Sequence, residues 1–144
     1  MSSEANEARG SIERLLGQFE KAHNASDVEG MLGCWGKDPV YTPQNSPAMT
    51  GREAVRRYQE QAYRNFRFDE HYRIDEIEVS GDVAWARGYS FGRVKILASG
   101  QEIDFGGPHR FPGANTLWIF HREDGHWRIH RYTFGADRPM APGT

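Results

Sequence analysis

The sequence predicts an α+β fold in which a strongly curved antiparallel sheet wraps around three N-terminal helices. In the first half of the chain apolar residues recur at helical spacing, whereas in the second half they alternate with polar residues over long stretches. Near the end, two aromatic, β-prone runs flank Glu123-Asp124-Gly125, which is typical of a β-hairpin. Helices and strands segregated in this way pack as separate layers, with the helices on one face of the sheet.

Three helices are expected within the first 66 residues. Residues 1–10 are polar and acidic, and we expect them to be disordered. The first helix begins at Ser11 and carries an apolar stripe that includes Leu15 and Phe19. A second, short helix spans 28–35 and ends before Pro39, because proline cannot continue the helical hydrogen bonds. The third runs from Gly51 to about Phe66.

The strands are expected to form one sheet of about four long strands plus a short one. The short strand lies among the helices, at 40–42, and long alternating stretches follow at 68–79 and 83–97. A further strand begins at 101–105 and is interrupted by Gly106-Gly107-Pro108, before the closing hairpin. Helices can close only part of the concave side of such a sheet, so a cone-shaped cavity should remain. We expect one domain over residues 11–136 and a flexible, Pro/Gly-rich tail over 137–144.

Charge and hydropathy exclude several classes of protein. The net charge is -2 and no stretch concentrates Lys or Arg, which argues against a nucleic-acid partner. No apolar run approaches the roughly 20 residues that span a bilayer, and the N-terminus does not resemble a signal peptide. We therefore expect a soluble, cytoplasmic protein with no membrane partner. Cys34, the only cysteine, is interpreted as a small buried hydrophobe.

Motifs for metals and nucleotide cofactors are also missing from the sequence. The six histidines form neither H-x-H nor H-E-x-x-H, and no P-loop, dinucleotide fingerprint or nucleophile elbow occurs. Asp69-Glu70-His71 is interpreted as a solvated strand start. A protein without metal or cofactor is the expectation.

Five short motifs occur in order between about Ser11 and Phe134. They are Ala22-His23-Asn24-Ala25-Ser26-Asp27, Asp38-Pro39-Val40-Tyr41, Gly51-Arg52-Glu53-Ala54-Val55, Gly81-Asp82-Val83-Ala84 and Asp124-Gly125-His126-Trp127-Arg128-Ile129. Together they resemble the nuclear transport factor 2-like superfamily, and its SnoaL-like and ketosteroid-isomerase-like branch in particular. The resemblance implies a conical pocket for an apolar small molecule and a homodimer built on the outer face of the sheet. It implies no single reaction, because members isomerise, cyclise, dehydrate, hydrate or only bind.

The groups that ketosteroid isomerases use are absent. Their mechanism needs a carboxylate base and an oxyanion hole made of a tyrosine and a protonated aspartate. The resemblance places the tyrosine position on Phe19, the base near Pro43 and the aspartate near Leu117 or Thr116. Any catalysis by this chain should therefore depend on other residues.

Strand alternation predicts which hairpin side chains face the cavity. Pairing across the turn groups the expected cavity-facing residues Asn115, Leu117, Ile119, His130, Tyr132 and Phe134. It assigns Trp118, Phe120, Trp127 and Ile129 to an outer core or dimer interface. In the preceding strand, Val83, Trp85, Arg87, Tyr89 and Phe91 share a side that the resemblance aims into the cone. A one-residue bulge would reverse either assignment and place Trp118 and Arg131 inside.

Three of these residues are candidate catalytic groups. His130 is the candidate acid/base, since imidazole titrates near neutral pH, and alanine in its place should remove turnover. Tyr132 is a candidate donor to a developing oxyanion. Arg87 would meet a substrate carboxylate or enolate, or Asp104 as an internal partner. The structural alternatives are a core histidine, an aromatic filler and an exposed arginine.

The remaining candidates are expected to bind substrate. They are Tyr89, Asn115, Trp85, Tyr41, Tyr58, Phe19, His23, Leu117, Phe134 and His109, of which His109 lies on the Gly106–Gly113 loop, where the sequence favours a solvated position over contact with a ligand. The leading hypothesis is a cofactor-free enzyme that catalyses proton transfer on a hydrophobic, oxygenated small molecule, in an isomerisation, cyclisation, dehydration or lyase reaction. The alternatives are a non-catalytic binding or assembly dimer with the same pocket, and a structural dimer whose cone is packed shut.

Overall fold

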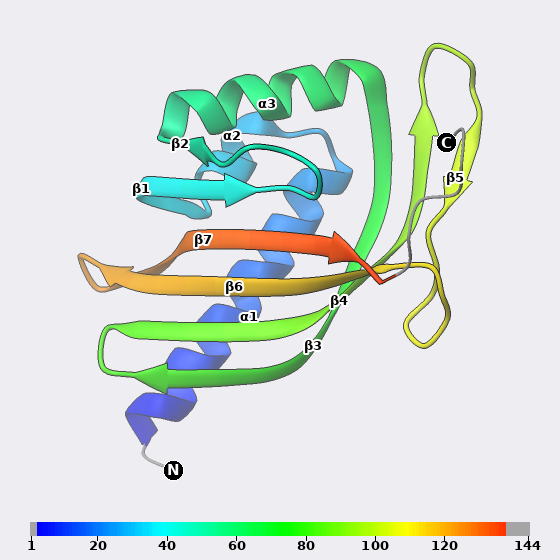
Figure 1. Ribbon diagram of the computed structural model, residues 1–144. Helices are drawn as coiled ribbons and strands as arrows, with labels where there is room; N and C mark the ends of the chain where they lie inside the picture. The colour runs from blue at the N-terminus through cyan, green and yellow to red at the C-terminus, as the bar shows by residue number, and fades with distance from the viewer. Residues whose placement is uncertain (1–2, 138–144) are drawn as a thin grey trace.

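The computed structural model describes residues 3–137, which form three helices and one curved, seven-stranded sheet (Figure 1). The helices are α1 (Ser3–Asn24), α2 (Val28–Leu32) and α3 (Arg52–Asn65). The strands are β1 (Trp35–Thr42), β2 (Met49–Thr50), β3 (Phe66–Ser80), β4 (Val83–Ile96), β5 (Glu102–Asp104), β6 (Ala114–Glu123) and β7 (His126–Ala136). The predicted α+β class, with a curved sheet beside N-terminal helices, is confirmed.

Several element boundaries differ from the prediction, most of all near the N-terminus. Helix α1 begins at Ser3, because its buried stripe already includes Ala8, so the expected disorder does not hold for residues 3–10. Helix α2 ends at Leu32, and Trp35 instead opens β1. Residues 1–2 and most of the expected flexible tail, 138–144, lie outside the described part of the chain. Within 3–137, no helix has the length and apolarity needed to cross a membrane.

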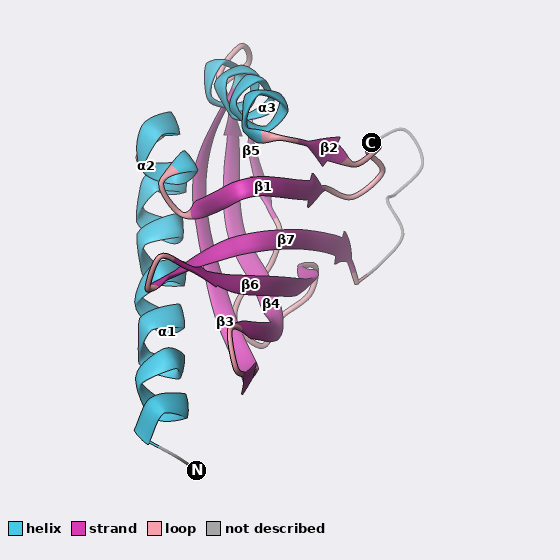
Figure 2. Ribbon diagram, turned by 90° about the vertical axis from the view of Figure 1, so that its left-hand side faces the viewer, coloured by secondary structure: helices cyan, strands magenta, loops and turns pink. Residues whose placement is uncertain are grey.

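The sheet has the order β2-β1-β7-β6-β4-β3, with β5 added to β4. All pairs are antiparallel except β1 and β7, which run parallel. Strands β3 and β4 bend together around the helices, and α1 lies along one side of the sheet (Figure 2). Close backbone approach helps this bend: a Cβ at Gly88 would lie 2.0 Å from the carbonyl oxygen of Arg73, and one at Gly92 2.0 Å from that of Asp69.

The concave side of the sheet packs against α1 and is largely aromatic. Trp118 stacks on Tyr132 with 3.5 Å between ring centroids, and Phe19 of α1 meets the Trp118 ring edge-on at 5.0 Å. All three side chains are at most 3% exposed. Cys34 is also buried in this core, and burial raises the pKa of its thiol to about 11, which confirms that it is a buried hydrophobe.

Candidate functional site

Strand β6 presents the face opposite to the predicted one to the core. Thr116, Trp118 and Phe120 are buried, whereas Asn115 and Leu117 are exposed on the convex side. The expected cavity positions of Asn115, Leu117 and Ile119 are therefore wrong. The cause lies in β4, where Ala86 pairs with Trp118 and Ala84 with Phe120, so that small residues leave room for large rings.

A β-bulge at His130 changes the phase of β7. Ile129 pairs with Phe120 and Arg131 pairs with Ile119, so His130 has no partner across the strand pair. Tyr132 and Phe134 lie on the concave side, and so do Trp127 and Ile129, which were assigned to the outer face. His130 lies on the convex side and stacks on His121 at 3.6 Å, so its expected place in the cavity is wrong. Trp118 lies inside, as in the alternative with a bulge, but the bulge lies in β7 and not in β6, and Arg131 lines a convex groove with Leu117.

The large β4 side chains also point away from the core. Trp85 is 37% exposed, and Arg87 is exposed and pairs with Glu76 rather than with Asp104. Tyr89 is buried, but its hydroxyl donates to Asp137 near the 106–113 loop instead of facing the core. The expected inward positions of these three residues are wrong, because β4 turns its small side chains inward.

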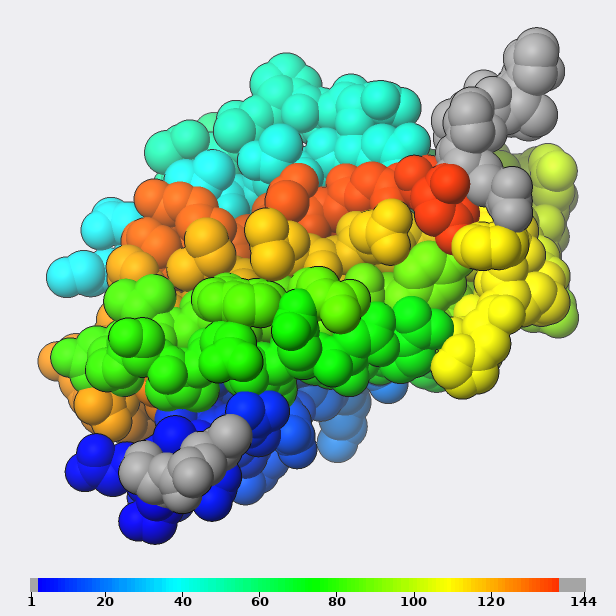
Figure 3. Space-filling view, turned by 60° about the horizontal axis from the view of Figure 1, so that its bottom comes forward, coloured from blue at the N-terminus to red at the C-terminus, as the bar shows by residue number. Residues whose placement is uncertain are grey.

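The loop over residues 106–113 stands at one end of the sheet (Figure 3). His109 lies on it, with Nδ1 at 3.4 Å from Arg73 Nη1, and is not among the residues that line the cavities described next. Arg73 also donates to the carbonyl oxygen of Pro108, and Arg110 pairs with Asp104 at 3.1 Å. These contacts fix the loop beside the open end of the cone.

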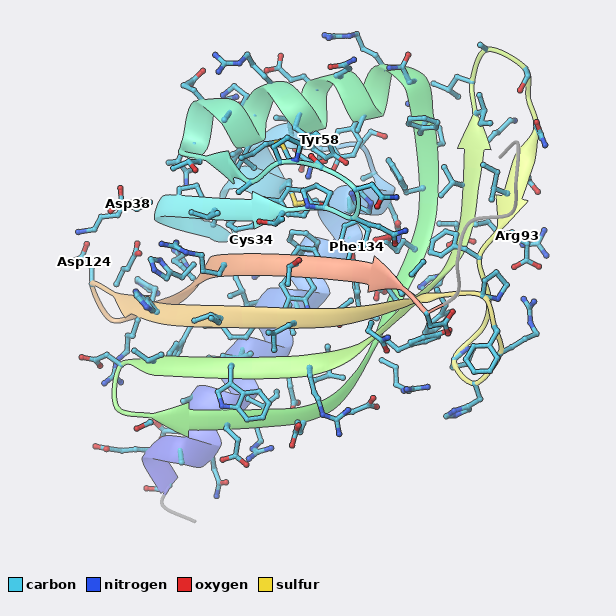
Figure 4. The ribbon with its side chains drawn as sticks, viewed as in Figure 1. Cys34, Asp38, Tyr58, Arg93, Asp124 and Phe134 are labelled. Atoms are coloured by element: carbon cyan, nitrogen blue, oxygen red, sulfur yellow. The ribbon has the colours of Figure 1, made fainter. Side chains whose placement is uncertain are left out.

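Two neighbouring cavities, which share three lining residues, occupy that end of the cone. The outer chamber has a volume of about 670 Å³ and is lined by Gln44, Phe68, Glu70, Ser90, Val94, Ile103, Asp104, Phe105, Phe111, Pro112, Gly113, Ala114, Phe134 and Ala136. The inner chamber has about 70 Å³ and is lined by Phe19, His23, Tyr41, Tyr58, Gln59, Ala62, Phe68, Glu70, Tyr72 and Phe134. Phe68, Glu70 and Phe134 line both, and Figure 4 marks Phe134 on β7 and Tyr58 on α3.

The inner chamber brings together five of the sequence candidates: Phe19, His23, Tyr41, Tyr58 and Phe134. Tyr132 lies behind this wall, where its ring stacks on that of Tyr41 at 5.4 Å. Their roles in binding or catalysis remain predictions. Trp85 and Tyr89 do not fill the cone, and cavities remain inside it. The alternative of a structural dimer whose cone is packed shut is therefore not supported.

Glu70 is the principal site residue that sequence reasoning missed. It was interpreted as solvated, but β3 turns Phe68, Glu70 and Tyr72 toward the helices. Asn24 fixes this stretch: its amide donates to the Glu70 carbonyl oxygen, and its Oδ1 accepts from the Glu70 N–H, both at 2.9 Å. The available signal was the alternation itself, which places a carboxylate between two aromatic residues on one strand face.

The Glu70 carboxyl lies in a network of buried and partly buried polar groups. Tyr72 donates its hydroxyl to Glu70 Oε2 at 2.5 Å, and His23 Nε2 lies 3.5 Å from the same oxygen. On its other side, His23 Nδ1 hydrogen-bonds the Tyr63 hydroxyl at 2.9 Å. The network therefore links β3 with the end of α1 and with α3.

Burial controls the protonation of this network. It raises the pKa of Glu70 to about 7, against the opposing effect of the Tyr72 hydrogen bond, and lowers the pKa of His23 to about 4. Although a separation of 3.5 Å suits an ion pair, burial disfavours both charges, so we interpret His23 as neutral at pH 7. Glu70 is then present in both protonation states near neutral pH. A carboxyl of this kind can either accept or donate a proton.

Comparisons with known proteins agree with this architecture. A family model described as SnoaL-like domain matches residues 4–133. No curated protein matches the chain. Within residues 3–137, no three His, Cys, Asp or Glu side chains cluster as metal ligands would.

Several solved structures share the fold at low sequence identity. A ketosteroid isomerase-like protein from Erwinia carotovora atroseptica is 21% identical, with a TM-score of 0.78 over 90% of this chain and 96% of the other. An NTF2-like protein with a cystatin-like fold from Novosphingobium aromaticivorans is 22% identical, with a TM-score of 0.68 over 94% and 85%. A putative calcium/calmodulin-dependent protein kinase type II association domain from Thiobacillus denitrificans is 18% identical, with a TM-score of 0.71 over 88% and 94%. These likenesses establish the NTF2-like fold and nothing finer.

Proposed function

Since this chain belongs to the SnoaL-like domain family, we propose that it is a small-molecule enzyme in which Glu70 moves a proton to or from a hydrophobic, oxygenated substrate. Isomerisation, cyclisation, dehydration and lyase reactions all need such a step. The observation that carries the proposal is a partly buried carboxyl, with a pKa of about 7, that lines both cavities. A general acid or base with a pKa near the working pH accelerates proton transfer by roughly 10²- to 10⁴-fold.

The surroundings of Glu70 suit this role. The outer chamber is walled mainly by apolar side chains, which would hold the body of the substrate and keep water from the reacting carbon. In its ionised form Glu70 would take a proton from a carbon beside a carbonyl group, or from a hydroxyl group. Tyr72 would stabilise the ionised form, because its hydroxyl already donates to Oε2. The protonated form would then return the proton to another atom of the same substrate.

The convex face supports a homodimer as part of this proposal. Val83, Trp85 and Leu117 are 45%, 37% and 44% exposed there, although they are large and apolar. Adjacent exposed apolar side chains of this kind are typical of protein interfaces. A second copy seated on this face would leave the chambers on the concave side open to ligands.

A proton-exchange screen tests the enzymatic assignment. Hydrophobic ketones and β-hydroxy ketones are incubated with the protein in D2O and followed by ¹H NMR for α-proton exchange or conversion. Glu70→Gln should lower the rate at least about 100-fold with the fold retained by circular dichroism. Glu78→Gln is the matched control, because Glu78 lies on the same strand but is exposed. Activity that survives in Glu70→Gln would exclude Glu70 as the proton-transfer group.

The second candidate is a non-catalytic ligand-binding or assembly dimer with the same pocket. Two observations favour it: the ketosteroid-isomerase groups are absent from this sequence, and a protein named as a kinase association domain shares the fold. Ligands that bind the wild-type chain without exchange or conversion across the whole panel would support this candidate over the enzyme.

A further inference from the structure

We propose that the inner chamber is a hydroxyl-recognition subsite, in which Gln59 accepts a hydrogen bond from an uncharged alcohol or phenol whose apolar body fills the outer chamber. The ligand is identified with the substrate on the strength of the proposed function; the subsite itself stands on the geometry of the two chambers.

The observation that points to a hydroxyl ligand is an unpaired acceptor on Gln59. It lies on α3, is 1% exposed and lines the inner chamber. Its Oε1 has no hydrogen-bond partner in the described structure. Six buried side-chain polar atoms of the described residues share this property, and Gln59 Oε1 is the one whose residue lines either chamber. An unpaired buried acceptor weakens a fold, so a ligand donor at this position would remove a penalty as well as add a contact.

The volumes of the two chambers determine which part of the ligand each can hold. At about 70 Å³, the inner chamber has less than half the volume of the roughly 150 Å³ cavity that accommodates a benzene molecule. It can take a hydroxyl group, but a ring must stay outside. The outer chamber, at about 670 Å³, lies within the roughly 300–1,000 Å³ range of small-molecule sites. A ligand that spans both would pass Phe68, Glu70 and Phe134 at the junction.

Charge decides which kind of head group fits. The described residues that line the two chambers include two acids, Glu70 and Asp104, and neither Lys nor Arg. His23 does not supply a positive charge at neutral pH, because burial lowers its pKa to about 4. A buried anion without a partner is strongly disfavoured. The chambers should therefore accept neutral donors and reject carboxylates, in contrast to the anionic substrate that an inward Arg87 would have favoured.

Three naphthalene probes test the subsite by isothermal titration calorimetry at pH 7 with the full chain. 2-Naphthol offers a donor, 2-methoxynaphthalene offers only an acceptor, and 2-naphthoate is an anion. We expect 2-naphthol to bind about tenfold more tightly than either analogue, a ratio that one net hydrogen bond supports. Equal or tighter binding of either analogue would overturn the proposal without any variant.

Gln59→Leu assigns the effect to one residue. It should reduce 2-naphthol affinity about tenfold, to the level of 2-methoxynaphthalene, while the affinity for 2-methoxynaphthalene stays the same. The melting temperature of the ligand-free protein should stay constant or rise, since an unpaired acceptor is removed. Gln61→Leu is the control, because Gln61 is an exposed glutamine of the same helix. An unchanged 2-naphthol preference in Gln59→Leu would place the hydroxyl elsewhere.

This experiment fails separately from the test of Glu70. Binding is measured without turnover, so a missing 2-naphthol preference overturns the subsite and leaves proton transfer by Glu70 untouched. Conversely, a 2-naphthol preference that depends on Gln59 would stand even where the exchange screen finds no reaction, and would then define the ligand of a binding protein.

Discussion

The two faces of the β6–β7 hairpin have similar composition but opposite environments. On the concave face Trp118 and Tyr132 stack in a core that leads to the chambers, while on the convex face Leu117 is exposed and His130 stacks on His121. Both faces carry aromatic or apolar side chains, so hydrophobicity alone does not determine which is buried. The partner strand does, because the small side chain of Ala86 lies opposite Trp118. Burial of a large ring is therefore decided by space on the neighbouring strand.

Two tryptophans on neighbouring strands give the largest expected contrast. Trp118→Ala should destabilise the protein by about 3–5 kcal/mol, because it opens a cavity among fully buried rings. Trp85→Ala removes a ring that is 37% exposed on the opposite face, so we expect a change of about 1 kcal/mol or less in the monomer. Urea unfolding of both variants measures the difference.

The association of the two tryptophan variants, measured as a function of protein concentration, gives a second comparison between the two faces. If the convex face forms a dimer, Trp85→Ala should weaken association in sedimentation experiments, while Trp118→Ala should act through folding. A large loss of monomer stability in Trp85→Ala would contradict the assignment of the two faces.

The second contrast concerns His23, which is buried, and Glu70, which is partly buried; their contributions to stability depend on pH with opposite signs. The pKa of Glu70 rises on folding from 4.5 to about 7, so its contribution to stability is present below pH 4.5 and is lost as the pH rises to 7. The pKa of His23 falls from 6.5 to about 4, so its contribution is present above pH 6.5 and is lost as the pH falls to 4. Each effect is on the order of 3 kcal/mol, and the two offset each other between pH 4.5 and 6.5.

A single substitution at either residue should reveal how the other residue makes stability depend on pH. Glu70→Gln should leave a protein that loses stability from pH 6.5 down to 4, and His23→Gln one that loses stability from pH 4.5 up to 7. Urea midpoints at several pH values measure both. His126→Gln provides the control, since His126 is exposed at the start of β7. Parallel pH profiles for wild type and both variants would show that the two groups are not buried as described.

These comparisons show what the sequence could and could not predict. Local patterns were sufficient for the class of fold, the family and the closing hairpin, because each motif depends on neighbouring residues. Periodicity could sort side chains into two faces, but it could not show that a bulge at His130 shifts the phase of β7. Alternation could group Glu70 with Phe68 and Tyr72 on one strand face, but it could not show that this face turns toward the helices, since that depends on hydrogen bonds to Asn24, 46 residues away along the chain. Long-range contacts of this kind leave no local signal.

The smallest expected effect belongs to His130, the residue that local reasoning favoured as acid/base. Its side chain lies on the convex face against His121, on the far side of the sheet from both chambers, and it lines neither of them. His130→Ala should therefore leave turnover and 2-naphthol affinity within about twofold of wild type, a change of less than 0.5 kcal/mol in binding free energy. Kinetics and calorimetry on the same preparation provide the measurement, with Glu70→Gln as the positive control. A loss of turnover in His130→Ala at unchanged stability would mean that the convex face takes part in the chemistry. The functional site could then no longer be assigned to the concave face alone.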